Sequence, residues 1–85
     1  VGSVTVNAGA AEALLDRSRL ASLLPVGIEA VEGPFSQGDV IQVRGPGDRV
    51  LGCGRAGYGH EETAQALGKR GQKPLIHYDY LYLID

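Results

Sequence analysis

The sequence has no tryptophan, no methionine, one phenylalanine and one cysteine among its 85 residues. The single cysteine, Cys53, excludes an internal disulfide, so packing must hold the fold, as is usual in a reducing compartment. No apolar run approaches the ~18 residues that a membrane-spanning helix needs, and the first residues lack the features of a signal peptide. We therefore expect a cytoplasmic protein with no membrane partner.

An excess of charge of one sign is also lacking. Eight Lys and Arg residues stand against ten Asp and Glu residues, for a net charge of −2. A dedicated nucleic-acid-binding domain is usually strongly basic, so any affinity for RNA has to come from a local patch. The length allows one small domain with little room for a deep cleft, and we expect no catalytic residue, metal or cofactor in this chain.

Glycine, by contrast, is abundant. It accounts for 13 of the 85 residues, about twice the average usage, which predicts many tight turns. The corners of a small barrel are expected at Gly27, Gly33, Gly38, Gly45 and Gly47. Because the chain begins with Val1 rather than Met, we expect residues 1–85 to be one domain, cut from the C-terminal part of a longer protein.

Local patterns predict short strands with a few short helices. Apolar and polar residues alternate in strands, Asn7 can cap a helix, and a Gly-Pro-Gly-Asp turn predicts a hairpin. The expected elements are strand 3–6, helix 8–15, helical turn 18–24, strands 28–32, 40–44 and 49–56, helix 60–67, and strands 75–77 and 80–84. With no βαβ repeat, the fold class is α/β mixed and mainly β: a small barrel of mostly antiparallel strands, plugged by Phe35.

Two motifs have both a functional and a structural interpretation. Residues 52–57 match the letters of the G-x-G-x-x-G dinucleotide motif, but the motif needs a βαβ unit; we expect close backbone packing or a bulge in the strand instead. His77 and Asp79 would share one face of a strand, where the histidine could act as a general base. No nucleophile lies near them in sequence, so we favour a structural hydrogen bond at a turn.

Basic and aromatic residues give two candidate binding surfaces. The candidate RNA-binding residues, which could also be a solvated loop, are Arg17, Arg19, Lys69, Arg70 and Lys73. Three tyrosines, Tyr78, Tyr80 and Tyr82, would line one face of a strand. That face could be a domain or subunit interface, could pack in the core of the domain itself, or could stack nucleic-acid bases.

Four segments together resemble the C-terminal PUA domain of the glutamate 5-kinase family: residues 7–10, 22–28, 32–40 and 76–81. The residues that carry the resemblance are Gly9, Ala10, Pro25, Gly27, Ile28, Gly33, Phe35, Gly38, Asp39, His77 and Asp79. Two features depart from the family: Asn7 stands where Asp is usual, and the connection over residues 68–74 is short.

The resemblance implies a PUA-like β pseudo-barrel with flanking short helices. It also implies a noncatalytic accessory domain that modulates regulation or assembly of a kinase, which phosphorylates glutamate with ATP and Mg in the first step of proline biosynthesis. That chemistry would belong to an N-terminal amino-acid kinase domain, the expected partner, in a homo-oligomeric enzyme. The alternative is an RNA-binding PUA module of an RNA-modifying enzyme, whose groove lies beside the first helix and residues 27–28.

Overall fold

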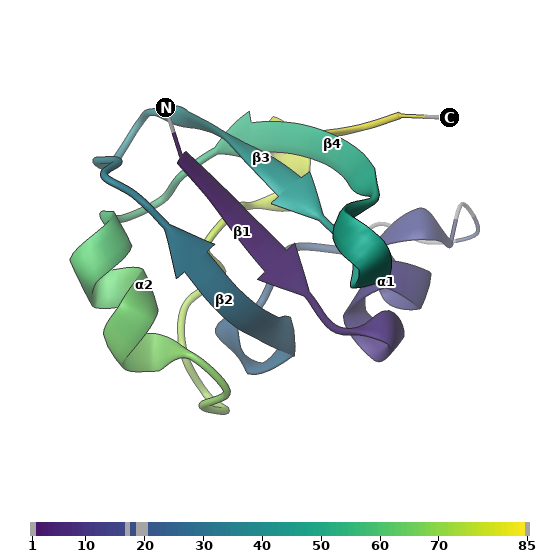
Figure 1. The fold of residues 1–85 in the computed structure, drawn as a ribbon, viewed down its shortest axis with the longest axis horizontal. Coiled ribbons are helices and arrows are strands. Elements are labelled where there is room, and N and C mark those ends of the chain that lie inside the picture. Colours follow the sequence, from purple (N-terminus) through teal and green to yellow (C-terminus); the bar gives the residue numbers. More distant parts are fainter. Residues whose placement is uncertain (1, 17, 19–20, 85) are drawn as a thin grey trace.

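One five-stranded sheet organises the domain in the computed structural model, which describes residues 2–16, 18 and 21–84 (Figure 1). The strands are β1 (Gly2–Val6), β2 (Ile28–Glu32), β3 (Val40–Arg44), β4 (Val50–Arg55) and β5 (Leu81–Leu83). Their order is β2-β1-β3-β4-β5. The β1–β3 pair is parallel and the other pairs are antiparallel, which confirms the mainly β, mostly antiparallel prediction.

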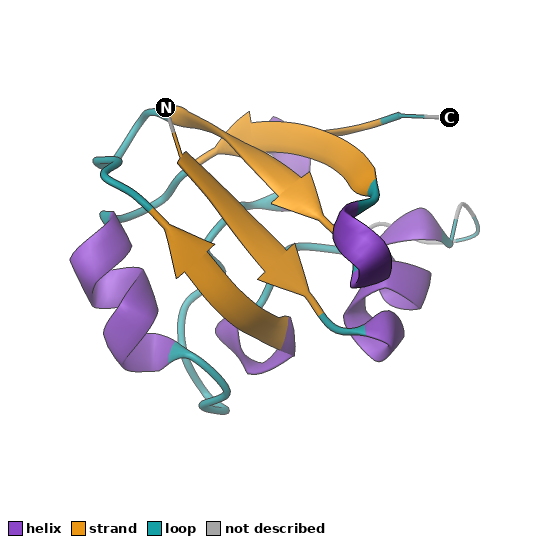
Figure 2. Cartoon of the chain, viewed as in Figure 1, coloured by secondary structure: helices purple, strands orange, loops and turns teal. Residues whose placement is uncertain are grey.

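Short helices flank the sheet at separate places, as Figure 2 shows. They are α1 (Ala8–Leu15) and α2 (His60–Ala66), with three 3₁₀ turns at Pro25–Gly27, Pro46–Asp48 and Tyr78–Tyr80. Both α-helices and the β3–β4 hairpin lie where the sequence predicts them. No helix in the described part of the chain is long and apolar enough to cross a membrane.

The core lies on the inner face of the sheet. Alternate residues of β1 and β3 point inward, and α1 closes over them with Ala11 and Leu14. The buried apolar residues of this cluster include Val4, Val6, Ala11, Leu14, Leu23, Ile28, Phe35, Ile41, Val43, Leu51, Leu75 and Ile76. Removal of this apolar surface from water is the main force that holds so small a domain together.

Asn7 joins β1 to α1 as the sequence predicts. Its Oδ1 accepts a hydrogen bond from the backbone N–H of Ala10 at 2.8 Å, which satisfies one of the free donors of the first helical turn. The backbone N–H of Asn7 donates to the carbonyl of Gly27 at 2.9 Å. The start of α1 is thereby tied to the turn that precedes β2.

Phe35 closes one end of the core, also as predicted. Its side chain is 3% exposed, and its ring meets the imidazole of His60 edge-on, with 5.8 Å between centroids. The backbone N–H of His60 donates to the carbonyl of Phe35 at 3.0 Å. The loop between β2 and β3 is therefore fixed against the first turn of α2.

Two predicted elements are wrong. In the described part of residues 18–24 there is no helical turn, and Leu23 instead forms an isolated antiparallel bridge with Ile76. For the same reason residues 75–77 contribute one bridge rather than a strand. The backbone N–H of Leu23 donates to the carbonyl of Ile76 at 2.9 Å, and the carbonyl of Leu23 accepts the N–H of Leu75 at 2.8 Å. The side chains of Leu23 and Ile76 are fully buried, so long-range packing overrides the local helical pattern.

The glycines have two different roles. Gly38 and Gly47 adopt positive φ angles at turns, as the corner prediction requires. Gly27 and Gly33 have ordinary φ and are needed for close packing instead. In β4, a Cβ on Gly54 would come within 2.6 Å of Ile76 Cγ2 and 2.8 Å of the carbonyl oxygen of Tyr80. This confirms close backbone packing over residues 52–57 rather than a dinucleotide loop.

Candidate interaction surface

A row of side chains crosses all five strands on the outer face of the sheet. Strand register places neighbours in the row opposite one another, and alternation keeps them on the same face. From edge to edge the row is Glu32, Ser3, Gln42, Cys53 and Tyr82. No local sequence pattern reveals this row, because it depends on pairing between strands that are far apart in the sequence. Of its members, the sequence indicates only Tyr82 as a candidate interface residue.

This outer face is hollowed, and apolar and polar side chains both line it. The hollow has a volume of about 790 Å³ and is lined by the row, by Arg44 and by apolar residues on and next to β3, β4 and β5. Three of these are strongly exposed: Tyr82 at 65%, Ile84 at 60% and Val40 at 57%. Exposed apolar side chains grouped over a concave face are typical of protein interaction sites. We call this surface the outer sheet face.

Two hydrogen bonds join polar side chains on the outer sheet face. The Nε of Arg44 donates to Oε1 of Gln42 at 2.7 Å, and the hydroxyl of Ser3 donates to Oε1 of Glu32 at 3.4 Å. They use one N–H of the Arg44 guanidinium and one oxygen of the Glu32 carboxylate, so a partner on this face has to meet the remaining polar atoms.

The three tyrosines do not share one strand face. Tyr78 and Tyr80 lie in a 3₁₀ turn and only Tyr82 lies on β5, so the strand predicted over residues 80–84 is present with the shorter limits Leu81–Leu83. All three are exposed, by 41%, 49% and 65%, so packing in the core of the domain itself is wrong for them. Tyr82 belongs to the outer sheet face.

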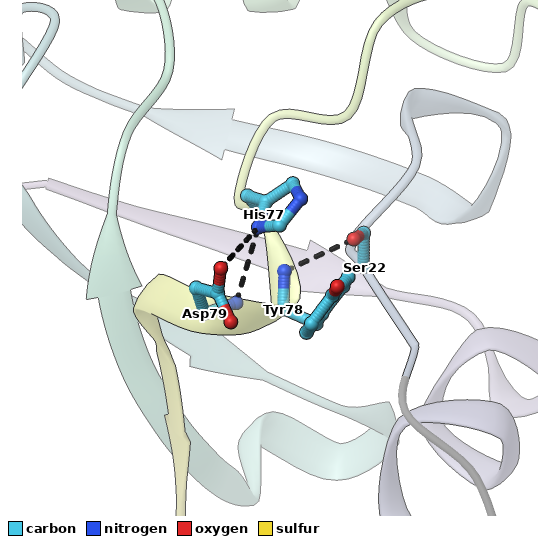
Figure 3. Close-up of polar contacts among 4 residues, drawn as sticks. All are labelled: Ser22, His77, Tyr78 and Asp79. Carbon is cyan, nitrogen blue, oxygen red and sulfur yellow. Dashed lines mark hydrogen bonds and ion pairs between the residues drawn. The ribbon is translucent and has the colours of Figure 1, made fainter.

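His77 caps the start of the 3₁₀ turn over Tyr78–Tyr80. Its Nδ1 accepts the backbone N–H of Asp79 at 3.2 Å and lies 3.6 Å from the Oδ2 of that residue (Figure 3). The carbonyl of His77 accepts the N–H of Tyr80 at 2.8 Å. The ring of His77 stacks on that of Tyr78, with 4.3 Å between centroids. The structural hydrogen bond at a turn is thus confirmed, and the shared strand face is wrong.

The same contacts argue against a catalytic histidine. The nearest candidate nucleophile in Figure 3 is Ser22, whose Oγ accepts the backbone N–H of Tyr78 at 3.0 Å. No hydrogen bond joins Ser22 to His77 among the contacts of the described residues. Ser22, His77 and Asp79 therefore fix the turn and do not form a nucleophile–base relay.

The predicted basic residues are only partly assembled. Lys69, Arg70 and Lys73 are exposed, and two of them, Lys69 and Lys73, line a cavity of about 220 Å³ between α2 and the following loop. Arg17 and Arg19 lie outside the described residues. The described residues therefore neither confirm nor exclude one continuous basic patch.

Tyr58 and Glu62 share the cavity of Lys69 and Lys73. The hydroxyl of Tyr58 donates to the carbonyl of Lys73 at 2.9 Å, which holds the loop against α2. Burial of the phenol, and secondarily the negative charge of Glu62, raise the pKa of Tyr58 above its usual value.

The predicted groove beside α1 is present and apolar. It has a volume of about 290 Å³ and runs between α1 and residues 22–27. Gly9, Ala10 and Gly27 line it, with Leu24 and Val26 exposed at its rim. No Lys or Arg is among the described residues that line this groove.

The other residues of the family motif serve the fold. Pro25 and Ile28 are buried. Oδ2 of Asp39 accepts the backbone N–H of Ser36 at 2.8 Å and so closes the turn before β3. A Cβ on Gly33 would come within 2.7 Å of the His60 ring.

Across residues 2–16, 18 and 21–84, no three His, Cys, Asp or Glu residues come close enough together to hold a metal ion. The glycine-rich motif over residues 52–57 lies mainly in β4 rather than at a strand-to-helix turn.

Comparison with protein families gives a match to the PUA domain over residues 2–78. Curated relatives are glutamate 5-kinases. That of Chlorobaculum tepidum is 47% identical over 83 residues, which are 98% of this chain and 23% of the relative. That of Bacteroides thetaiotaomicron is 37% identical over 82 residues, 96% of this chain and 22% of the relative. The chain thus spans less than a quarter of the length of these relatives.

Solved structures agree on the fold. A PUA domain from Aeropyrum pernix K1, solved as a tartrate complex, has a TM-score of 0.78 and 26% identity, over 89% of this chain and 40% of that one. A chain of the archaeal box H/ACA sRNP Nop10–Cbf5 complex has a TM-score of 0.71 and 15% identity, over 100% of this chain and 24% of that one. The second likeness concerns the fold alone.

Proposed function

Since the chain belongs to the PUA domain family, we propose that it is a noncatalytic accessory domain of a glutamate 5-kinase, which modulates the regulation or assembly of that enzyme. The support is the similarity to two glutamate 5-kinases over 96–98% of this chain. The parent enzyme would phosphorylate glutamate with ATP and Mg in the cytoplasm. This chain spans only 22–23% of these relatives, and we place this chemistry in a kinase domain outside it.

The observation that carries the proposal is the outer sheet face. Tyr82, Ile84 and Val40 expose apolar surface around a hollow in which Arg44 is hydrogen-bonded to Gln42. Burial of such a face against the kinase domain, or against a second copy of the enzyme, gains free energy from the apolar area removed from water. If the contact differs between two states of the kinase, it shifts their populations and hence regulation.

Deletion of this domain from the full-length enzyme tests the proposal. We expect the truncated enzyme to keep glutamate phosphorylation while its inhibition by proline or its oligomer size changes. Steady-state kinetics with a proline titration, and light scattering after size-exclusion chromatography, measure these properties. An enzyme unchanged in activity, inhibition and size would overturn the proposal, as would loss of all activity by a truncated enzyme that is still folded.

RNA binding is the second candidate function. It is favoured by the exposure of Lys69, Arg70 and Lys73 and by the cavity that Lys69 and Lys73 share. Real phosphate contacts make affinity fall steeply as salt rises. Filter binding of a structured RNA should then weaken with salt, and weaken further when the three residues are replaced by Gln. If no RNA is bound even at 20 mM salt, this candidate is wrong.

A further inference from the structure

A second hollow lies away from the outer sheet face, where β4 ends beside the C-terminal 3₁₀ turn. Its volume is about 450 Å³, and the residues that line it are Gln37, Gly38, Arg55, Ala56, Gly57, Pro74, Leu75, His77 and Tyr80. This volume lies within the range of small-molecule sites, roughly 300–1,000 Å³. We call it the Arg55 pocket.

Hydrogen-bond donors meet in the Arg55 pocket. The guanidinium of Arg55 lies over the ring of Tyr80, 5.5 Å from its centroid, which holds the side chain in one orientation. His77 also lines the pocket, and because its Nδ1 accepts the N–H of Asp79, the neutral imidazole carries its proton on Nε2. A guanidinium fork beside an imidazole N–H is a donor set that suits an oxyanion.

No carboxylate forms an ion pair with Arg55 within the described part of the chain, where the printed interaction of its side chain is with the Tyr80 ring. Two acidic residues beside the lining residues make contacts of their own. Asp39 accepts the N–H of Ser36, and Asp79 lies 3.6 Å from Nδ1 of His77; neither lines the pocket.

We propose that the Arg55 pocket binds a small organic anion through a phosphate or carboxylate group, held by Arg55 and by Nε2 of His77. The absence of Asp and Glu from the lining disfavours a zwitterion such as a free amino acid, because its ammonium group would find no anionic partner. Phosphate monoesters and dicarboxylates are the two sources of such an anion. The proposal concerns this chain alone and does not depend on the identity of the parent enzyme.

Amide chemical shifts of the isotopically labelled chain test the proposal at low ionic strength. The probes are glycerol 3-phosphate and succinate, with glycerol as the uncharged control. We expect at least one anion to shift the amides of Gly38, Arg55 and Gly57 in a saturable way while glycerol shifts none. Which anion binds more tightly distinguishes the phosphate source from the dicarboxylate source.

Two substitutions decide whether Arg55 is the contact. Arg55→Gln should weaken binding by about tenfold or more, the loss of ~1.5–3 kcal/mol typical of a charge-assisted hydrogen bond. Arg49→Gln removes an equal charge at the other end of β4, away from the pocket, and should leave binding unchanged. The proposal is overturned if neither anion binds at 10 mM, or if both variants weaken binding equally. The spectra also report whether each variant is folded.

Discussion

Gly27 packs directly against Ala10: a Cβ on Gly27 would come within 2.5 Å of the Ala10 Cβ. Gly27 also accepts the hydrogen bond of the Asn7 N–H at 2.9 Å, so the turn before β2 and the first turn of α1 are fixed together. The contact is steric, because Gly27 has no positive φ.

The Gly27→Ala variant should therefore unfold more easily than the wild-type chain. Overpacking at a fixed backbone contact typically costs ~1–3 kcal/mol, and urea unfolding measures the loss. Gly9→Ala is the matched control, because its Cβ would meet nothing closer than 3.6 Å. In a helix, Gly→Ala stabilises by up to ~1 kcal/mol. Equal effects of the two substitutions would contradict the steric explanation.

Substitution of Asn7 tests the capping of α1 separately. Removal of its Oδ1 acceptor in Asn7→Ala leaves the N–H of Ala10 without its 2.8 Å partner, and should cost ~1 kcal/mol of unfolding free energy. Asn7→Asp keeps an acceptor and should stay close to wild type. A destabilised Asp variant, or an Ala variant as stable as wild type, would show that the cap does not act as described.

Tyr58 makes stability depend on pH in the alkaline range. Its pKa is raised by burial and by Glu62, so folding favours the neutral phenol. The stability from this group is complete below the ordinary tyrosine pKa of ~10 and is lost as pH rises through the higher pKa of the folded state. Unfolding free energies measured between pH 8 and pH 11.5 should fall with pH in the wild-type chain.

The Tyr58→Phe variant supplies the comparison for that pH series. It loses the hydrogen bond to the Lys73 carbonyl, a cost of ~0.5–1.5 kcal/mol at neutral pH. It also loses the ionisable group, so its stability should fall less with alkaline pH than that of the wild type. Parallel pH curves for the two proteins would assign the alkaline loss to other groups.

Local patterns predict correctly the elements whose ends are marked by Gly or Pro. The β-branched runs of β2 and β3 are bounded by Gly and Pro, and their predicted limits match the structure. The pattern fails at the C-terminus because alternating tyrosines look the same in a strand and in a turn. There the N–H of Asp79 bonds to the His77 ring and starts a 3₁₀ turn.

The candidate surface was harder to predict, because it depends on which strands pair. In the predicted strand over residues 40–44, the alternation of side chains places Val40 and Gln42 on the same face. Nothing local indicates that β1 runs parallel to β3, or that Leu23 pairs with Ile76. The row from Glu32 to Tyr82 exists only once those long-range pairings have formed.

The most direct measurement of the central claim is the effect of Tyr82→Asp in the full-length glutamate 5-kinase. Tyr82 is 65% exposed on the outer sheet face, so the variant should fold, while a charge there opposes burial against a partner. Ala64→Asp, at an exposed position of α2, adds the same charge elsewhere. We predict that proline inhibition or oligomer size changes in the Tyr82 variant alone, with glutamate phosphorylation retained. Identical behaviour of both variants and the wild-type enzyme would contradict the account.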